Sequence, residues 1–218
     1  MPSSTEASAL PVTFKGSRLA TALLRLLGWR LDFAGFPTPQ GVAVVYPHTS
    51  NWDFVVGMLA KWALGIPANY LAKDSLFRIP LLGRWMRWVG GIGIERSAAH
   101  GLVGQMTEVY SQAKATNRVL WLGVTPEGTR GLTPGWRTGF YQMALAAQVP
   151  LALVKFDWGR KRISIEDFFW TTGDVQRDFE HIAKVYEGVQ GCRAHLACPI
   201  QPWSPRPNEA QTRKGTTA

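Results

Sequence analysis

The sequence predicts a single α/β domain in which helices flank a central mixed sheet. Three observations lead to this prediction. Short apolar runs of strand length alternate with longer runs that have helical periodicity. Polar loops follow several of the strand-like runs directly. A chain of 218 residues without internal repeats suits one domain with a sizeable core.

The N-terminal region is predicted to contain a tail and an amphipathic helix. Residues 1–16 are mostly small and polar, which is typical of a disordered tail. In the segment 17–35, leucines recur at helical spacing, while Arg18 and Arg25 lie on the opposite side. A helix of this kind suits an anionic membrane interface, so we expect the segment to lie on one. A helix that covers the core of its own domain would show the same pattern.

The main domain is predicted to span residues 36–190, with strands and helices in alternation. The predicted strands are "VAVVY", "ANYLA", "IGIE", "RVLWLGV", "PLALVKF" and "ISIE", with "DWGRKR" as a hairpin turn before the last. The predicted helices run from "NWD" to about Gly65, over 75–89, over 97–116, through "GFYQMALAAQ" and over 174–189. Residues 191–218 are rich in proline and polar side chains, which favours an extended tail.

Composition narrows the class of partner. The chain has 24 Lys and Arg against 15 Asp and Glu, a net charge of +9, which suits nucleic acid, a phosphorylated metabolite, an acidic carrier protein or an anionic membrane. Ten tryptophans beside these cations favour a bilayer interface, although tryptophan also fills cores. No run reaches the roughly 18 uninterrupted apolar residues of a spanning helix, and the N-terminus lacks a secretory signal pattern. We therefore expect the protein to be soluble or to lie on a membrane surface.

Metal and disulfide frameworks are not predicted. Cys192 and Cys198 are the two cysteines of the chain, and their spacing fits neither a zinc site nor a disulfide framework. A reducing compartment is the expected setting.

Polar residues gather in the loop "PHTSNWD", which follows a predicted buried strand. His48 is suited to take a proton at neutral pH, and Asp53 is spaced to fold back and orient its ring. Ser50 or Asn51 as a helix cap would explain the same polar residues. Because no cysteine or nucleophile-elbow serine lies beside this pair, the nucleophile would be a hydroxyl of the substrate.

Three further loops, "AKD", "ERS" and "PEGTRG", also follow predicted strands. In open α/β sheets the carboxyl ends of the strands are where ligands bind. The last loop combines a glycine that exposes backbone N–H groups with a hydroxyl and a guanidinium, a set that suits phosphate, whereas its glutamate would hold a hydroxyl or brace an arginine. A turn with a solvated arginine is the plainer alternative. The candidate substrate-binding residues are Lys73, Arg96, Glu127, Gly128, Thr129 and Arg130.

The order of these motifs resembles the 1-acylglycerol-3-phosphate O-acyltransferase family of glycerolipid acyltransferases. "HTSNWD" resembles the HxxxxD motif, "GGIGIER" the second motif, "VTPEGTR" the third and "VPLALV" the fourth. The similarity covers about residues 41–156. Two departures stand out: Leu153 lies near the place of a second proline in the fourth motif, and nothing after about residue 160 resembles the family.

The resemblance implies transfer of a fatty acyl group to the hydroxyl of a lysophospholipid, with 1-acylglycerol-3-phosphate converted to phosphatidate in phospholipid biosynthesis. The donor would be acyl-CoA or acyl-carrier protein, and neither a metal nor a bound cofactor is expected. The resemblance makes His48 the general base and Asp53 its partner. It places the acceptor's phosphate and glycerol on Arg96 and residues 127–130, and the fourth motif along the acyl and acceptor channel. The expected location is an anionic membrane, at the cytoplasmic face of the inner membrane.

Other functions stay open from the sequence. The departures from the family leave room for another acceptor, such as a lyso-ornithine lipid. A non-catalytic phospholipid-binding domain would keep the fold, but it has no need of the pair His48 and Asp53. A nucleic-acid-binding protein would suit the charge, yet it would interleave basic and aromatic residues on one groove or sheet. Here the candidate cations fall in separate loops at one sheet edge, so no nucleic acid is expected as a partner.

Overall fold

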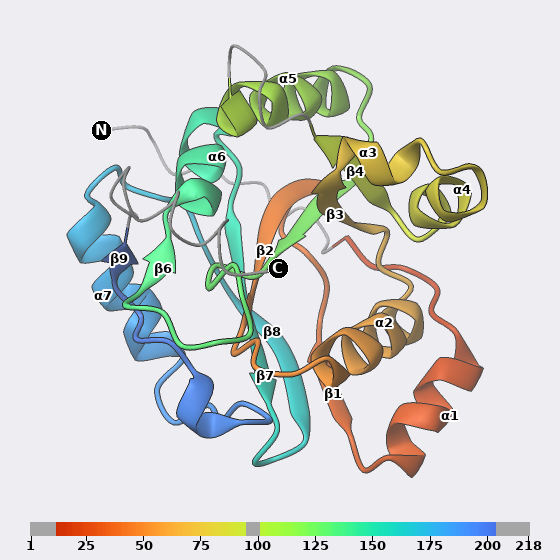
Figure 1. Ribbon diagram of the computed structural model, residues 1–218, viewed down its shortest axis with the longest axis vertical. Helices are drawn as coiled ribbons and strands as arrows, with labels where there is room; N and C mark the ends of the chain where they lie inside the picture. The colour runs from red at the N-terminus through yellow and green to blue at the C-terminus, as the bar shows by residue number, and fades with distance from the viewer. Residues whose placement is uncertain (1–11, 95–100, 204–218) are drawn as a thin grey trace, which may run out of the picture.

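A seven-stranded sheet forms the centre of the molecule in the computed structural model, which describes residues 12–94 and 101–203. Its strands are β1 (Arg30–Phe33), β2 (Gln40–Tyr46), β3 (Ala68–Lys73), β4 (Gly91–Ile94), β5 (Leu120–Val124), β7 (Leu151–Asp157) and β8 (Arg162–Phe169). They lie in the order β1-β8-β7-β2-β5-β3-β4 (Figure 1). Neighbours are parallel except β7 and β8, which form the predicted hairpin. The sheet is therefore mixed, as predicted.

Helices cover both faces of this sheet, which confirms the predicted fold class. They are α1 (Arg18–Leu26), α2 (Trp52–Leu64), α3 (Asp74–Phe77), α4 (Pro80–Trp88), α5 (Gly101–Ala115), α6 (Gly139–Ala147) and α7 (Val175–Val185). Helices α1 and α2 pack on one face, and α5, α6 and α7 pack on the other. The predicted helix over 75–89 is thus two helices, α3 and α4. No described helix is long and apolar enough to span a membrane.

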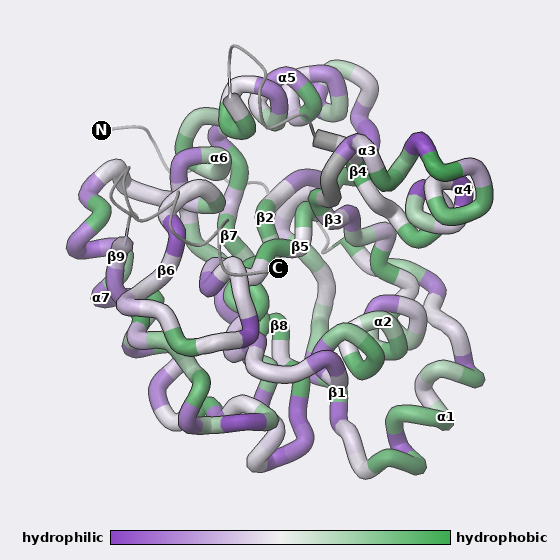
Figure 2. The backbone as a smooth tube through the Cα atoms, viewed as in Figure 1, coloured by the Kyte–Doolittle hydropathy of each residue, from purple (hydrophilic) through white to green (hydrophobic). Residues whose placement is uncertain are grey.

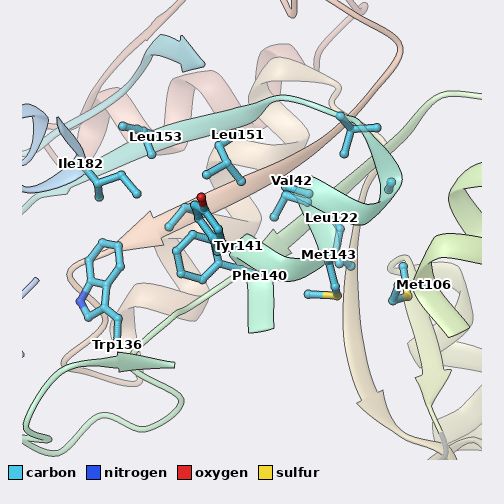
Figure 3. Close-up of a cluster of buried hydrophobic side chains, with 14 of the residues drawn as sticks. Val42, Met106, Leu122, Trp136, Phe140, Tyr141, Met143, Leu151, Leu153 and Ile182 are labelled. Atoms are coloured by element: carbon cyan, nitrogen blue, oxygen red, sulfur yellow. The ribbon is translucent and has the colours of Figure 1, made fainter. Parts of the chain in front are cut away.

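The alternation of side chains along β2 divides the core into two layers. Val42 and Val44 face α5, α6 and α7, where they join the cluster shown in Figure 3. Ala43 faces the other way, toward α1 and α2. In that second layer Phe36 stacks on Trp121 with ring centroids 3.8 Å apart. Figure 2 shows the hydrophobic character of these central strands, which are buried on both faces.

The N-terminal helix is shorter than the predicted segment 17–35. Ser17 caps α1 by accepting a hydrogen bond from the Ala20 N–H group, and the helix ends at Leu26. The chain then turns at Gly28, which has a φ of +81°, and residues 30–33 form β1 beside β8. A left-handed residue is incompatible with helix continuation, and glycine adopts it without strain.

Parts of both predicted tails lie against the domain. Val12 forms an antiparallel bridge with Phe36, so the described residues 12–16 are not the expected disordered tail. Residues 191–203 are not an extended tail either. They include the 3-10 helix η1 (Ala194–Leu196) and strand β9 (Pro202–Trp203), which pairs with β6 (Trp136–Arg137). Residues 1–11 and 204–218, the rest of these two predictions, lie outside the described residues.

Candidate active site

His48 and Asp53 lie together at the carboxyl end of β2. The loop that follows this strand carries His48, and Asp53 is the second residue of α2. The Nδ1 atom of His48 is 3.3 Å from Oδ2 of Asp53. The His48 side chain is 20% exposed and that of Asp53 only 2%, so the carboxylate is buried beneath a ring that solvent or a substrate can reach. The structure therefore brings the two predicted catalytic residues into contact.

A set of hydrogen bonds holds the Asp53 carboxylate in place. Oδ2 accepts the N–H groups of Thr49 at 2.7 Å and Ser50 at 2.8 Å. Oδ1 accepts the indole N–H of Trp158 at 2.7 Å. Burial alone would raise the pKa of Asp53, but hydrogen bonds from His48, Ser50, Trp158 and Thr49 outweigh it, and the pKa is lowered. An ionised Asp53 favours the tautomer with a proton on Nδ1 of His48, which leaves the lone pair of Nε2 able to accept a proton.

Helix capping explains only part of this loop. The side chain of Asn51, the N-cap residue of α2, makes no capping hydrogen bond. The Ser50 hydroxyl accepts the Trp52 N–H group at 3.2 Å. Asp53 instead folds back onto the loop, and its negative charge in the first helical turn is also favoured by the helix dipole. The polar residues of this loop thus serve mainly to position Asp53 and His48.

Glu127 bonds to the main chain of two other segments. This residue follows β5 and is almost fully buried, at 1% exposure. Oε2 accepts the backbone N–H of His48 at 2.6 Å, and Oε1 accepts that of Cys198 at 3.2 Å. Burial raises the pKa of Glu127, although these two hydrogen bonds act in the opposite direction. Glu127 therefore fixes the main chain at His48 and braces no arginine among the described residues.

The rest of this loop is exposed at the same edge of the sheet. Gly128 has a φ of +68°, and a Cβ atom there would come within 2.8 Å of the Arg137 side chain, so a glycine is required. The Thr129 hydroxyl accepts the N–H group of Gly131 at 3.3 Å. Arg130 lines a pocket and is available to a ligand there.

This pocket has a volume of about 330 Å³ and contains an arginine that the sequence analysis missed. Its walls are Thr49, Ser50, Asn51, Trp52, Arg130 and Arg193, and the first four of these directly follow His48 in the chain. Arg193 belongs to the C-terminal segment that resembles nothing in the family. Its basic charge was the only signal in the sequence, and the charge alone does not reveal its position.

Two predicted cations are not placed in this pocket by the structure. Lys73 is the last residue of β3, so its backbone lies at the predicted sheet edge. Arg96 falls within 95–100, outside the described residues. Their contribution to a shared basic pocket stays a prediction. Within residues 12–94 and 101–203, no group of three His, Cys, Asp or Glu side chains is arranged to hold a metal ion.

Residues 33–155, more than half of the chain, match the family model described as Acyltransferase. The chain belongs to the acyltransferase family. The matched region contains the His48–Asp53 pair and the Glu127 loop, and the resemblance inferred from the motifs is confirmed.

Two known proteins are similar to this acyltransferase. The 1-acyl-sn-glycerol-3-phosphate acyltransferase epsilon of Mus musculus is 33% identical over 119 residues, which are 53% of this chain and 32% of the relative. The chain therefore spans about a third of that relative's length. The crystal structure of the 1-acyl-sn-glycerophosphate (LPA) acyltransferase PlsC from Thermotoga maritima superposes with a TM-score of 0.50 at 18% identity. The superposed region covers 77% of this chain and 73% of the PlsC chain. This likeness supports the assignment of the fold.

Proposed function

We propose that this acyltransferase moves a fatty acyl group from acyl-CoA or acyl-carrier protein to the hydroxyl of 1-acylglycerol-3-phosphate, giving phosphatidate for phospholipid biosynthesis. The observation that carries the proposal is the contact between His48 and the buried Asp53, in a loop whose next residues line a pocket with two arginines. The Mus musculus relative is a 1-acyl-sn-glycerol-3-phosphate acyltransferase, which supports the choice of acceptor.

The geometry supports a direct transfer without an acyl-enzyme. Nε2 of His48 would take the proton from the acceptor hydroxyl as its oxygen attacks the thioester carbonyl carbon. The tetrahedral intermediate would then collapse: the new C–O ester bond remains, the C–S bond breaks, and the thiolate takes the proton from His48. Asp53 would stay ionised and stabilise the imidazolium between the two proton transfers.

A place for the acyl chain is supported by an apolar cavity between α2 and the sheet. This cavity has a volume of about 120 Å³. Small and medium-sized apolar residues in its lining include Gly57 and Ala60 from α2, and Ala43, Gly123 and Val154 from the sheet. Val154 belongs to the run that resembles the fourth family motif.

Exposed apolar residues on α1 and α4 support a location at a membrane surface. Leu26 of α1 is 83% exposed, and Leu81 and Trp88 of α4 are 86% and 74% exposed. An apolar groove of about 710 Å³ joins this region, lined by residues of α1, by Trp62 of α2 and by Trp88. Such patches are typical of surfaces that meet a lipid or a protein partner. With a net charge of +9, the expected lipid surface is anionic, as on the cytoplasmic face of an inner membrane.

An acyl-transfer assay with lysophosphatidate tests the proposal. His48→Ala is expected to lose roughly 10² to 10⁴-fold in kcat, because a positioned general base contributes about that much. His181→Ala is a matched control, since His181 is exposed on α7, and this variant should keep full activity. Residual activity near wild type in His48→Ala would rule out the mechanism.

Assays with several acceptors and donors determine which lysolipid accepts the acyl group and which thioester donates it. Both acyl-CoA and acyl-carrier protein are offered with lysophosphatidate, other lysophospholipids and a lyso-ornithine lipid. A clear preference for the lyso-ornithine lipid would replace the proposed acceptor. Phospholipid binding by the wild type without transfer to any acceptor would identify a non-catalytic binding domain.

A further inference from the structure

The C-terminal segment 190–201 is joined to the loops that hold the candidate catalytic residues. It contacts the loop after β2, the loop after β5 and the turn after β7. The hydrogen bonds are Trp158 N–H to Gln190 O at 2.8 Å, Arg193 N–H to Thr49 Oγ1 at 3.0 Å, Cys198 N–H to Glu127 Oε1 at 3.2 Å and Tyr46 O–H to Cys198 O at 3.0 Å. This segment is therefore part of the site, although it lies outside the region matched by the family model.

Arg193 and Arg130 approach the same pocket from different parts of the chain. Within the described residues, no carboxylate lies within 4 Å of either guanidinium group, whereas Arg78, Arg160 and Arg162 each pair with an aspartate. Two like charges that face one pocket without a counter-charge repel each other. A bound anion would relieve this repulsion and use both guanidinium groups as hydrogen-bond donors.

We propose that Arg193 is a substrate-binding residue that, together with Arg130, holds the phosphate monoester of the acceptor. The proposal rests on the function proposed above and deepens it. Paired guanidinium groups suit a phosphomonoester, which carries up to two negative charges, better than the singly charged phosphodiester of other lysophospholipids. Arg193 would thus help the enzyme to select lysophosphatidate over zwitterionic lysolipids.

The position of the pocket favours the phosphate of the acceptor over those of coenzyme A. Four of its residues, 49–52, directly follow His48 in the chain. In 1-acylglycerol-3-phosphate the free hydroxyl and the phosphate are on adjacent carbons, so a phosphate in this pocket leaves the hydroxyl close to the base. In coenzyme A the long pantetheine arm separates the thioester from every phosphate.

Equilibrium binding of glycerol 3-phosphate tests the proposal independently of catalysis. The full-length protein is titrated by calorimetry, and quenching of tryptophan fluorescence gives a second readout because Trp52 lines the pocket. Arg193→Gln is expected to raise the Kd about tenfold or more, since a hydrogen bond between charged groups contributes about 1.5–3 kcal/mol. Arg193→Lys keeps the charge and should lose less. Arg177→Gln, an equal change of charge on α7, should bind as the wild type does.

Kinetics then separate a binding role from a structural one. In Arg193→Gln, the KM for lysophosphatidate is expected to rise about tenfold, by the same reasoning, while kcat and the KM for acyl-CoA stay within about twofold. Because the Arg193 side chain is exposed, the Arg193→Gln variant should unfold at the same temperature as the wild type. The preference for lysophosphatidate over lysophosphatidylcholine should shrink in parallel.

Several outcomes would overturn the proposal. These are a wild type that does not bind glycerol 3-phosphate, an unchanged Kd in Arg193→Gln, or a variant that loses coenzyme A binding and keeps glycerol 3-phosphate binding. If the wild type transfers no acyl group and Arg193→Gln still weakens glycerol 3-phosphate binding, the proposed function fails and the role of Arg193 as a phosphate ligand stands.

Discussion

His48 is held by a carboxylate on each side, one on its ring and one on its main chain. Asp53 contacts Nδ1 and Glu127 accepts the backbone N–H group. The two carboxyl groups differ in environment: several hydrogen bonds lower the pKa of Asp53, whereas burial raises that of Glu127. The site thus separates Asp53, which the proposed mechanism uses to support proton transfer, from Glu127, which fixes the position of the loop.

The variant Trp158→Phe tests whether the hydrogen bond from Trp158 holds Asp53 in position. The change removes the indole N–H group that Oδ1 accepts at 2.7 Å but keeps an aromatic ring to pack against Trp29. Loss of one hydrogen bond to a carboxylate corresponds to about 1.5–3 kcal/mol, so kcat is expected to fall about tenfold or more. The KM for lysophosphatidate should stay the same.

The pH profile of Trp158→Phe distinguishes this role from a loss of packing. The Trp158 hydrogen bond is one of the contacts that lower the pKa of Asp53, so its removal should raise that pKa. The proposed mechanism needs both a neutral base and an ionised Asp53, so activity should fall toward low pH in two steps, and the step that belongs to Asp53 should move to higher pH in the variant. Trp170→Phe, at a half-exposed tryptophan, serves as the control. If the Asp53 step lies at the same pH in the variant and the wild type, Trp158 does not tune Asp53.

At the scale of the residue, the sequence predicts the local pair and not its long-range partners. The five-residue spacing places Asp53 in the first turn of the helix that follows His48, so their contact is predictable. The partners Glu127 and Trp158 are 79 and 105 residues away from the groups they bind. Their roles depend on strands β5 and β7 lying on either side of β2, which the alternation of strands and helices does not specify.

At the scale of the element, the C-terminal segment is fitted closely against the catalytic loop. A Cβ atom at Gly191 would lie 2.8 Å from Thr49 Oγ1 and 3.1 Å from Pro47 Cβ. Contacts of this length are below normal van der Waals separation. The C-terminal segment and the loop after β2 therefore approach each other so closely that only glycine fits at position 191. The segment therefore helps to define the loop that carries His48 as well as the pocket.

Gly191→Ala is expected to disturb this contact without removing a chemical group. Overpacking of this kind lowers the free energy of unfolding by about 1–3 kcal/mol, and a displaced loop should reduce kcat/KM for lysophosphatidate about tenfold. Urea unfolding and steady-state kinetics measure the two effects. Gly139→Ala is the matched control, because no other atom lies within 4 Å of a Cβ there. Wild-type activity in Gly191→Ala would mean that the segment does not position the loop.

The two ends of the chain show where reading elements from the sequence fails. The helical spacing of leucines predicts a segment that continues past Gly28, but residues 30–33 pair with β8, more than 130 positions along the chain. The strand here depends on a partner that periodicity does not reveal. Residues 191–203 have the composition of a tail, yet their backbone groups bind the active-site loops. The polar, proline-rich composition of this segment predicts that it has no hydrophobic core of its own. It does not reveal hydrogen bonds between the segment's backbone and distant loops.

At the scale of the whole molecule, α2 links the chemical site to the apolar surface. Its first residue, Trp52, lines the arginine pocket, and Trp62, near its other end, lines the groove that continues to α1 and α4. The helix has 13 residues, which corresponds to a length of about 20 Å. Docking of the groove on a bilayer would therefore hold His48 within about one helix length of the lipid surface.

The double variant Leu81→Ser/Trp88→Ser tests this arrangement. Both side chains are largely exposed on α4, so the fold should tolerate the change. Burying apolar side chains of this size in lipid contributes about 1.5–3 kcal/mol each. Binding to phosphatidylglycerol-containing vesicles in a sedimentation assay is therefore expected to fall by more than about tenfold. Transfer to a water-soluble short-chain lysophosphatidate should be unchanged, because the variant leaves the pocket intact.

Salt and a control variant separate the apolar contribution from the electrostatic one. Raising the ionic strength from about 0.1 M to about 1 M shortens the Debye length from about 10 Å to about 3 Å, so wild-type binding to anionic vesicles should weaken. The apolar contribution is not screened in this way, and the double variant should remain weaker than the wild type at both salt concentrations. Trp170→Ser, which changes an exposed tryptophan elsewhere, should bind vesicles normally. Equal vesicle binding by the double variant and the wild type would show that α4 does not meet the membrane, and the groove would then belong to another partner.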